Sequence, residues 1–141
     1  IVGPKSTIKG VSILGPVRPT TQVEISMYDA RTLGIEGVVR ASGDIKGTPG
    51  CILVGPKGQV KLEEGVIVAA RHIHMHTNDA PKFGLKDKDV VKVRVGKERA
   101  LVFENVIVRV HPDFALDMHI DIEEGNAAGI NNGDLGEIIR E

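Results

Sequence analysis

The apolar residues of this 141-residue chain fall into short segments that are rich in β-branched side chains and bounded by glycine or proline. Such segments are typical of strands, because Val and Ile suit a pleated surface and Gly and Pro favour the turns between strands. A chain of this length buries about 68–70% of its extended surface, which is enough for a hydrophobic core. We therefore predict a mainly β fold with strands at 11–14, 38–39, 52–54, 66–70, 90–95, 100–110 and 135–139.

One hairpin can be assigned from its turn residues. The sequence Gly-Pro-Lys-Gly at 55–58 combines a proline, which fixes φ, with a glycine, which permits a positive φ. We expect it to join a strand at 51–54 to a strand at 59–62. Val-Gly-Pro-Lys occurs at 54–57 after a strand and also at 2–5, where only Ile1 precedes it. We interpret the chain as beginning inside a hairpin, without its natural N-terminus.

Three segments share a pattern in which a potential metal ligand stands ten positions before a glycine that is followed by Ile or Leu. The three pairs are Glu24 with Gly34, His74 with Gly84, and His119 with Gly129. A short helix pattern lies between the two members of each pair, and glycine suits the left-handed C-cap of such a helix. Ser26 with Asp29 and Asp121 with Glu124 suit its N-terminal end. The repeat predicts units of strand, ligand, short helix, turn and strand.

The sequence Arg-His-Ile-His-Met-His at 71–76 is the strongest local indication of a functional site. Alternate side chains of a strand share a face, so His72, His74 and His76 should point the same way. Two imidazoles at this spacing can bind one zinc ion at Zn–N distances of about 2.0–2.1 Å. The repeat makes His119 the natural third ligand, which leaves an open position of the catalytic kind. A solvated strand face that happens to carry histidines is the alternative.

Other candidate residues favour structural interpretations. His76 aligns with a helix N-cap, so we expect it to cap the helix or to lie outside the metal ligands. His111, in Val-His-Pro-Asp, fits a turn, and Cys51 fits a small core position because no base partner is visible.

Arg18 lies between Gly-Pro and Pro-Thr-Thr, in a loop that presents a guanidinium. Such a fork suits bidentate recognition of phosphate. A surface arginine in a proline-rich turn is the alternative. Glu24 could supply an oxygen ligand to a metal ion if its strand meets the histidine strand.

Composition argues against several partners. The net charge of −1 and the small number of aromatic residues (three Phe, one Tyr) are unlike a nucleic-acid binder, which carries a basic stripe and stacking platforms. The single cysteine cannot form an intrachain disulfide, which is compatible with a reducing compartment. No apolar run approaches the roughly 18–20 residues of a membrane span. We expect a cytoplasmic protein without nucleic-acid or membrane partners.

Together these stretches resemble the phosphate propanoyltransferase family, the PduL-type phosphotransacylases of bacterial microcompartments and related fermentative pathways. Agreement runs over nearly the whole chain in the expected order. The matching blocks are Leu-Gly-Pro-Val-Arg at 14–18, Thr-Gln-Val-Glu-Ile-Ser at 21–26, Ser-Gly-Asp at 42–44, Gly-Pro-Lys-Gly at 55–58, Glu-Gly-Val-Ile-Val-Ala at 64–69, Arg-His-Ile-His-Met-His at 71–76, Phe-Glu-Asn-Val at 103–106 and Phe-Ala-Leu-Asp-Met-His-Ile-Asp at 114–121.

The resemblance implies a fold of two small β-barrels capped by short α-helices, here expected at 1–69 and 70–141. It implies a zinc-dependent acyltransferase that converts a short-chain acyl-CoA, such as propanoyl-CoA, and phosphate reversibly to acyl phosphate and CoA. It further implies a two-zinc site with roles for seven residues: His72, His74 and His119 on one zinc, Glu24 on the other, Arg18 on phosphate, and Leu14 and Asn126 on CoA.

The chain departs from the family pattern in two places. The family carries another His-x-His motif near its N-terminus for the second zinc, and the 141 residues contain no such motif before residue 71. We expect that it was lost with the missing N-terminal segment or is present on a separate piece. Ser12 also stands where some relatives carry a basic residue near CoA. A zinc-dependent thioester hydrolase and a non-catalytic β-barrel with a relic metal site are the alternative functions. Homo-oligomerisation and residence in a microcompartment are left open.

Overall fold

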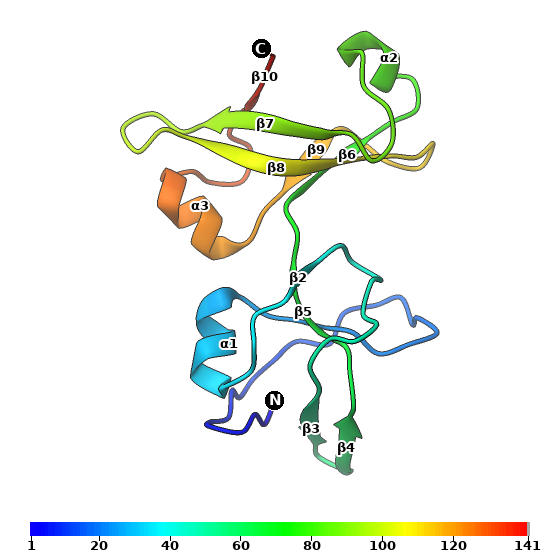
Figure 1. Ribbon diagram of the computed structural model, residues 1–141, viewed down its shortest axis with the longest axis vertical. Helices are drawn as coiled ribbons and strands as arrows, with labels where there is room; N and C mark the ends of the chain where they lie inside the picture. The colour runs from blue at the N-terminus through cyan, green and yellow to red at the C-terminus, as the bar shows by residue number, and fades with distance from the viewer. Residues whose placement is uncertain (141) are drawn as a thin grey trace. The chain divides into compact units, whose positions relative to one another are not determined.

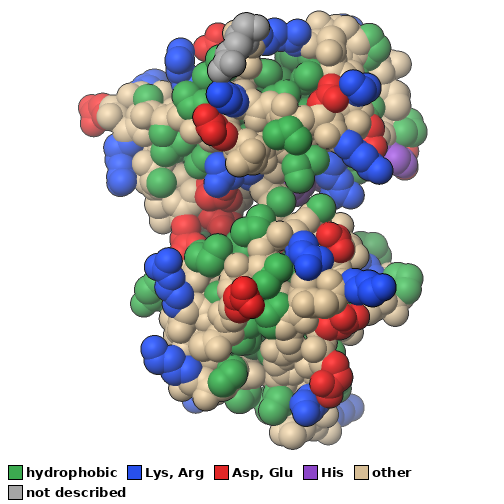
Figure 2. Space-filling model, in the orientation of Figure 1, with side chains coloured by type: hydrophobic (Ala, Val, Ile, Leu, Met, Phe, Trp, Pro, Cys, Tyr) green, Lys and Arg blue, Asp and Glu red, His purple; other side chains and the backbone are tan. Residues whose placement is uncertain are grey.

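The computed structural model describes residues 1–140 and is mainly β, with three short helices among these residues (Figure 1). Its contacts separate the chain into two compact units, Ile1–Ala69 and Ala70–Glu141, referred to as unit 1 and unit 2. Among the described residues no helix is long and apolar enough to cross a bilayer. Acidic and basic side chains are interspersed on the visible face of each unit (Figure 2), so that face carries no extended basic stripe.

Unit 1 is built around a short parallel sheet. Its middle strand β5 pairs in parallel with β1 on one side and with β2 on the other, and a separate antiparallel hairpin is formed by β3 and β4. The hairpin turns between Gly55 and Gly58, as predicted. The elements are β1 (Val23–Glu24), α1 (Met27–Leu33), β2 (Val39–Arg40), β3 (Cys51–Gly55), β4 (Gly58–Leu62) and β5 (Val66–Ala69).

The core of unit 1 joins the helix to both sheets. Leu33, from the last turn of α1, is fully buried and packs with Val66 of β5 and Cys51 of β3. Burying a side chain of this size contributes about 1.5–3 kcal/mol relative to leaving it in water. The ends of β1 and β5, including Glu24, are therefore held in place by apolar packing on the opposite side.

Unit 2 contains one five-stranded sheet in the order β10-β7-β8-β6-β9. Strand β6 is parallel to β8 and antiparallel to β9, and β7 pairs antiparallel with both β8 and β10. The long β7–β8 pair is the yellow-green ribbon of Figure 1. The elements are β6 (His72–Met75), α2 (Ala80–Phe83), β7 (Val90–Val95), β8 (Leu101–Val110), β9 (Asp117–His119), α3 (Ile122–Ala128) and β10 (Glu137–Ile139).

The expectation of two closed barrels is not confirmed. Strands β9 and β10 are the two edges of the unit 2 sheet, and within residues 70–140 no pairing joins these edges to each other. The sheet is therefore open, while unit 1 has two separate small sheets. That each unit is a barrel domain stays a prediction.

The strand–helix–strand repeat around the three candidate ligands is confirmed. In each copy a short helix follows the ligand and ends at a glycine in the left-handed conformation, with φ of 76°, 66° and 64° at Gly34, Gly84 and Gly129. Ser26 caps α1 by accepting the backbone N–H of Asp29 at 3.0 Å. A complete capping box between Asp121 and Glu124 begins α3.

Two strand predictions require correction. Residues 11–14 form no strand, and the side chains of Ile13 and Leu14 are 99% and 85% exposed. β-Branched residues alone do not make a strand where no neighbouring strand takes up their hydrogen bonds, because propensity reflects packing on a sheet. The last strand begins at Glu137 rather than at Leu135, which is 93% exposed.

Candidate metal centre

Three histidines of unit 2 meet at one edge of its sheet. One nitrogen from each of His72, His74 and His119 lies within 4.8 Å of the others. Their ring centroids are 4.8 Å apart for His72 and His74, 5.0 Å for His72 and His119, and 4.4 Å for His74 and His119. The side chains that the sequence predicted as ligands of one ion therefore form a single cluster.

The strand arrangement explains the cluster. In β6 the residues alternate, so Ile73 and Met75 enter the core while His72 and His74 point to the other face. The neighbouring strand β9 runs antiparallel and places His119 directly opposite His72. Cross-strand partners of this kind bring their Cβ atoms to about 4.5–5.5 Å, which is within reach of a shared ion.

One hydrogen bond orients the His72 ring, and one ion pair joins the start of β6 to helix α3. Nδ1 of His72 lies 2.9 Å from the carbonyl oxygen of Ala70. A carbonyl can only accept, so this bond places the proton on Nδ1 and leaves the lone pair of Nε2 for a metal. Arg71 forms a half-buried ion pair of 2.6 Å with Glu124 of α3. It thereby fixes the start of β6 to the helix that follows His119.

An aromatic ring covers one of the three candidate ligands. Phe114 stacks on His74 with centroids 4.0 Å apart and an interplanar angle of 13°. Burial lowers the pKa of His74 below its ordinary value of 6.5. The positive charges of His119, His72 and Arg109 lower this pKa further, and the carboxylate of Asp117 opposes them. The imidazole of His74 consequently stays neutral, the form that binds a metal, to a lower pH than a free histidine.

The donor set fits a zinc ion. Tetrahedral zinc with Zn–N bonds of about 2.0–2.1 Å needs nitrogens about 3.4 Å apart, which small rotations of the three rings can reach. His119 is exposed and the other two are half-buried, so the cluster is open on one side. Three imidazoles with an open side are the ligand arrangement that is typical of catalytic rather than structural zinc sites.

Of the remaining residues, His111 and Cys51 lie where the sequence predicted, whereas the N-cap of α2 is Asp79 and not His76. The alternative expectation for His76, a place outside the candidate ligands, agrees with its absence from the histidine cluster. His76 accepts the backbone N–H of Asn78 through Nδ1 at 2.9 Å, in the turn before α2. His111 accepts the backbone N–H of Asp113 in the same way at 3.0 Å. Cys51 is buried in the core of unit 1, and burial raises the pKa of its thiol.

Arg18 and Glu24 lie in unit 1 and share one hydrogen-bonding partner, Ser42. Arg18 donates from Nη1 to Oγ of Ser42 at 3.1 Å. Oε1 of Glu24 accepts the amide N–H of Gln22 at 2.7 Å and lies 3.5 Å from the same Oγ of Ser42. A guanidinium and a carboxylate are thus connected through one hydroxyl. The proposed roles of both residues stay predictions.

The two residues expected to contact CoA have different surroundings. Leu14 is in an exposed segment of unit 1. Asn126, on α3, lines a hollow of about 730 Å³ in unit 2, and His119 lines the same hollow. An elongated substrate that contacted Asn126 could therefore reach the histidine cluster without leaving this hollow. Contact of either residue with CoA stays a prediction.

Comparison with known proteins decides the family. The model of the phosphate propanoyltransferase family matches residues 1–131. The chain belongs to the phosphate propanoyltransferase family.

Three curated relatives carry that family name. The phosphate propanoyltransferase of Thermotoga maritima is 55% identical over 140 residues, which cover 99% of this chain and 67% of the relative. That of Listeria monocytogenes is 53% identical over 140 residues, covering 99% and 66%. That of Salmonella typhimurium is 53% identical over 133 residues, covering 94% and 63%. The chain thus spans about two thirds of the length of these phosphate propanoyltransferases.

Sequence reasoning gave no role to three residues that surround the candidate ligands and Arg18. Gln22 and Ser42 form the hydrogen bonds around Arg18 and Glu24, and Phe114 covers His74. All three fall in blocks that resemble the phosphate propanoyltransferase family, at 21–26, 42–44 and 114–121. The resemblance of these blocks to the family could have marked the three residues as functional candidates. Which residue each of them contacts is shown only by the contacts between distant segments.

Proposed function

We propose that this protein is a phosphotransacylase, which moves a short acyl group such as propanoyl reversibly between coenzyme A and inorganic phosphate. One observation carries the proposal: within a family match that spans residues 1–131, the nitrogens of His72, His74 and His119 lie within 4.8 Å of one another. The family name of the relatives supports the reaction, and the cluster supports a metal-assisted form of it.

His72, His74 and His119 would hold one zinc ion. When bound there, zinc supplies positive charge and a vacant position that stabilise developing negative charge, an effect worth several kcal/mol in acyl transfer. Glu24 is the expected ligand of a second zinc. Among the described residues, however, it belongs to no group of three ligands. A second ion therefore has no part in the proposed reaction.

Arg18 would bind the phosphate. Its planar guanidinium can take two phosphate oxygens at once and turn a third toward the thioester carbonyl. CoA then leaves as a thiolate, for which a thiol pKa of about 8.5 makes strong acid assistance unnecessary. A covalent intermediate on Cys51 is not part of the proposal. Its thiol is buried with a raised pKa, which disfavours the nucleophilic thiolate.

A thiol-release assay tests the reaction. Purified protein is incubated with propanoyl-CoA, with and without inorganic phosphate, and the acyl product is trapped with hydroxylamine. We expect release of CoA that depends on phosphate and yields acyl phosphate. Phosphate-independent release with free acid as the product would indicate a zinc-dependent thioester hydrolase. If no CoA is released and the purified protein contains no zinc, the result would indicate a non-catalytic protein.

Replacing Arg18 tests its role in that reaction. We expect Arg18→Ala to raise the KM for phosphate, or to lower kcat, by about 100-fold or more, because a charged bidentate contact is lost. Arg31→Ala, at an exposed position of α1 in the same unit, is the matched control and should leave both constants unchanged. An unchanged rate of Arg18→Ala at low phosphate would refute the assignment.

Partners and location follow from this proposal. Short-chain acyl-CoA, CoA and phosphate are the expected substrates, and zinc is the expected cofactor. The cytoplasm, or the interior of a bacterial microcompartment, is the expected location. That location and any homo-oligomer stay predictions.

A further inference from the structure

Ser42 connects the two residues of unit 1 to which roles have been assigned. Its Oγ accepts an N–H of Arg18 at 3.1 Å and an N–H of Gln22 at 3.0 Å. It can donate its own proton only toward Oε1 of Glu24, at 3.5 Å, which is a long contact. A hydroxyl has one proton to donate and two lone pairs, so these contacts use its full capacity.

Gln22 fixes the other side of the cluster. Its amide nitrogen donates to Glu24 at 2.7 Å and to Ser42 at 3.0 Å, and its amide oxygen accepts the backbone N–H of Gly43 at 2.6 Å. Both amide protons and the oxygen are therefore engaged. The opposite orientation of the amide would direct its oxygen at a carboxylate, so the network selects the observed one.

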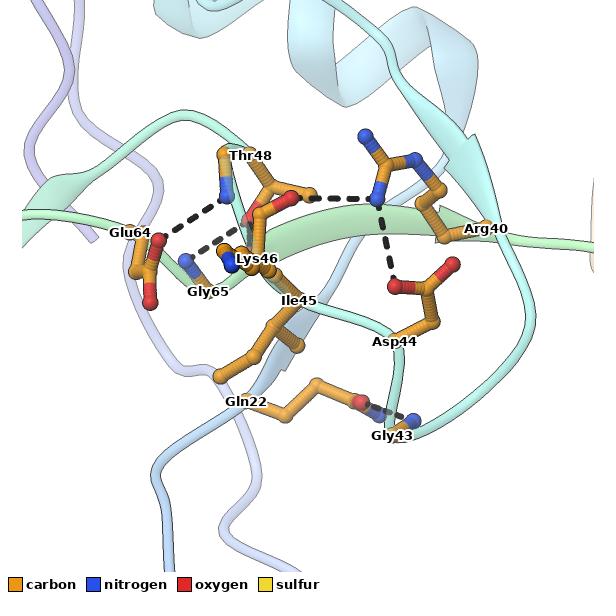
Figure 3. A network of polar contacts seen from close by, with 10 residues as sticks. Gln22, Arg40, Gly43, Asp44, Ile45, Lys46, Thr48, Glu64 and Gly65 are labelled. Carbon is orange, nitrogen blue, oxygen red and sulfur yellow. Dashed lines mark hydrogen bonds and ion pairs between the residues drawn. The ribbon is translucent and has the colours of Figure 1, made fainter.

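The loop that carries Ser42 is held by other contacts. Figure 3 shows Gln22 reaching Gly43 and, farther along the loop, a group of bonds that does not involve the hydroxyl of Ser42. Removing that hydroxyl should therefore leave the loop in place. The contacts are Arg40 with Asp44 at 3.3 Å, Arg40 with the carbonyl of Lys46 at 3.1 Å, the N–H of Gly47 with Glu64 at 2.9 Å, and the N–H of Gly65 with Thr48 at 2.9 Å.

Arg18 needs such an anchor. It is an exposed, rotamer-rich side chain on a loop, and ordering it when an anion arrives would cost side-chain entropy. A hydrogen bond that orders the guanidinium in advance reduces this cost. The bond to Ser42 uses one N–H of a group that has five, so an edge of the fork is still available to a ligand.

We propose that Ser42, supported by Gln22, is a positioning residue that presents the Arg18 guanidinium to a tetrahedral oxyanion such as phosphate. This proposal rests on the role of Arg18 in the proposed function and adds to it the residues that determine the strength of phosphate binding. Ser42 acts through Arg18 and is not itself assigned a contact with the substrate.

Substitutions at Ser42 test the proposal by steady-state kinetics. Ser42→Ala should raise the KM for phosphate about tenfold with little change in kcat, as expected for losing one hydrogen bond to a charged group. Ser42→Thr keeps a hydroxyl and should restore most of the affinity. Ser6→Ala, at an exposed serine of the same unit, is the matched control. An unchanged KM in Ser42→Ala, or equal impairment of Ser42→Thr and Ser42→Ala, would overturn the proposal.

Gln22→Glu is a second variant with a distinct chemical effect. It keeps an oxygen that can accept the N–H of Gly43 but removes both amide donors and places a second carboxylate beside Glu24. We expect the phosphate KM to rise at least as much as in Ser42→Ala. A KM equal to that of the unmodified protein would remove Gln22 from the proposal.

Two measurements that do not depend on acyl transfer test the role of Ser42 separately from the proposed reaction. Calorimetric titration with inorganic phosphate gives the dissociation constant, and nuclear magnetic relaxation of the Arg18 Nε–H reports its mobility. Ser42→Ala should weaken phosphate binding about tenfold and make this group more mobile. These results would stand even if no acyl transfer were found. Equal affinity and equal mobility in the two proteins, or no phosphate binding to the unmodified protein, would overturn it.

Discussion

At the scale of single residues, the surroundings of the five histidines divide them into two groups. His72, His74 and His119 converge with their nitrogens within 4.8 Å. His76 and His111 instead accept backbone N–H groups inside turns. The first group resembles a ligand set, and the second stabilises local chain reversals. The number of histidines alone would not have separated these roles.

This division predicts how zinc binding responds to substitution. His119→Ala should lower zinc affinity by about 100-fold or more, because an imidazole ligand is lost. His111→Ala is the matched control, since it removes a histidine of the same unit that lies outside the cluster. The measurement is the zinc content per chain after dialysis against a weak chelator. Undiminished zinc in His119→Ala would contradict the assignment.

The lowered pKa of His74 predicts a dependence of stability on pH. In the metal-free protein, folded His74 resists protonation below its ordinary pKa of 6.5, whereas the unfolded chain takes up the proton. The free energy of unfolding should therefore be unaffected by this group above about pH 7. It should fall as the pH drops from about 6.5 toward the lowered pKa of the folded state. Urea denaturation across this range should show a smaller decrease for His74→Gln.

At the scale of elements, each copy of the repeat contains a short helix that ends at a glycine C-cap. Helix α3 (Ile122–Ala128) contains one glycine, Gly125, and is followed by another, Gly129. Only Gly129 has a positive φ, of 64°. A Cβ at Gly125 would find its nearest neighbours at 3.9 Å, which is ordinary van der Waals contact. The two glycines therefore differ in conformation rather than in available space.

Alanine at these two positions should have opposite effects. Gly125→Ala should stabilise the protein by about 0.5–1 kcal/mol, because glycine loses more backbone entropy in a helix. Gly129→Ala should destabilise it by about 1–2 kcal/mol, because an L-residue is disfavoured in the left-handed region. Urea denaturation of both variants checks the prediction. Changes of the same sign would contradict it.

At the scale of the whole molecule, metal binding and folding should be linked. A ligand that binds only the native state stabilises it by about 2.7 kcal/mol at a hundred times its dissociation constant. The Tm should therefore rise with added zinc and return to its metal-free value with a chelator. In His74→Ala the dependence on zinc should be largely lost. An equal rise in Tm for both proteins would place the ion elsewhere.

Most of the histidine cluster could be predicted from local patterns. The alternation of His72 and His74 with Ile73 and Met75 is a two-residue period, and it places the histidines on one face wherever the segment forms a strand. The match between Glu24, His74 and His119 in the repeat predicted His119 as the third member of the cluster without knowledge of the strand pairing. The local hairpin and the glycine C-caps followed from residue type for the same reason.

Residues 11–14 show where local patterns fail. Their β-branched side chains predicted a strand, yet the segment has no strand partner in the structure and its side chains are exposed. A strand needs a neighbour to pair with, and a sequence pattern does not specify that neighbour. The two barrels stay a prediction for a related reason, since closing a sheet depends on contacts between distant edges.

Sequence patterns were thus sufficient to predict the strand–helix–strand repeat, the shared face of His72 and His74, and the choice of His119. The shared face depends on a two-residue period, and the choice of His119 depends on a ten-residue spacing that recurs in three segments. The folded chain was needed to show that β9 sets His119 opposite His72, that Phe114 covers His74, and that Ser42 joins Arg18 to Glu24. These contacts join segments that are distant along the chain. They depend on which strands and loops become neighbours when the core is buried, and no local pattern contains that information.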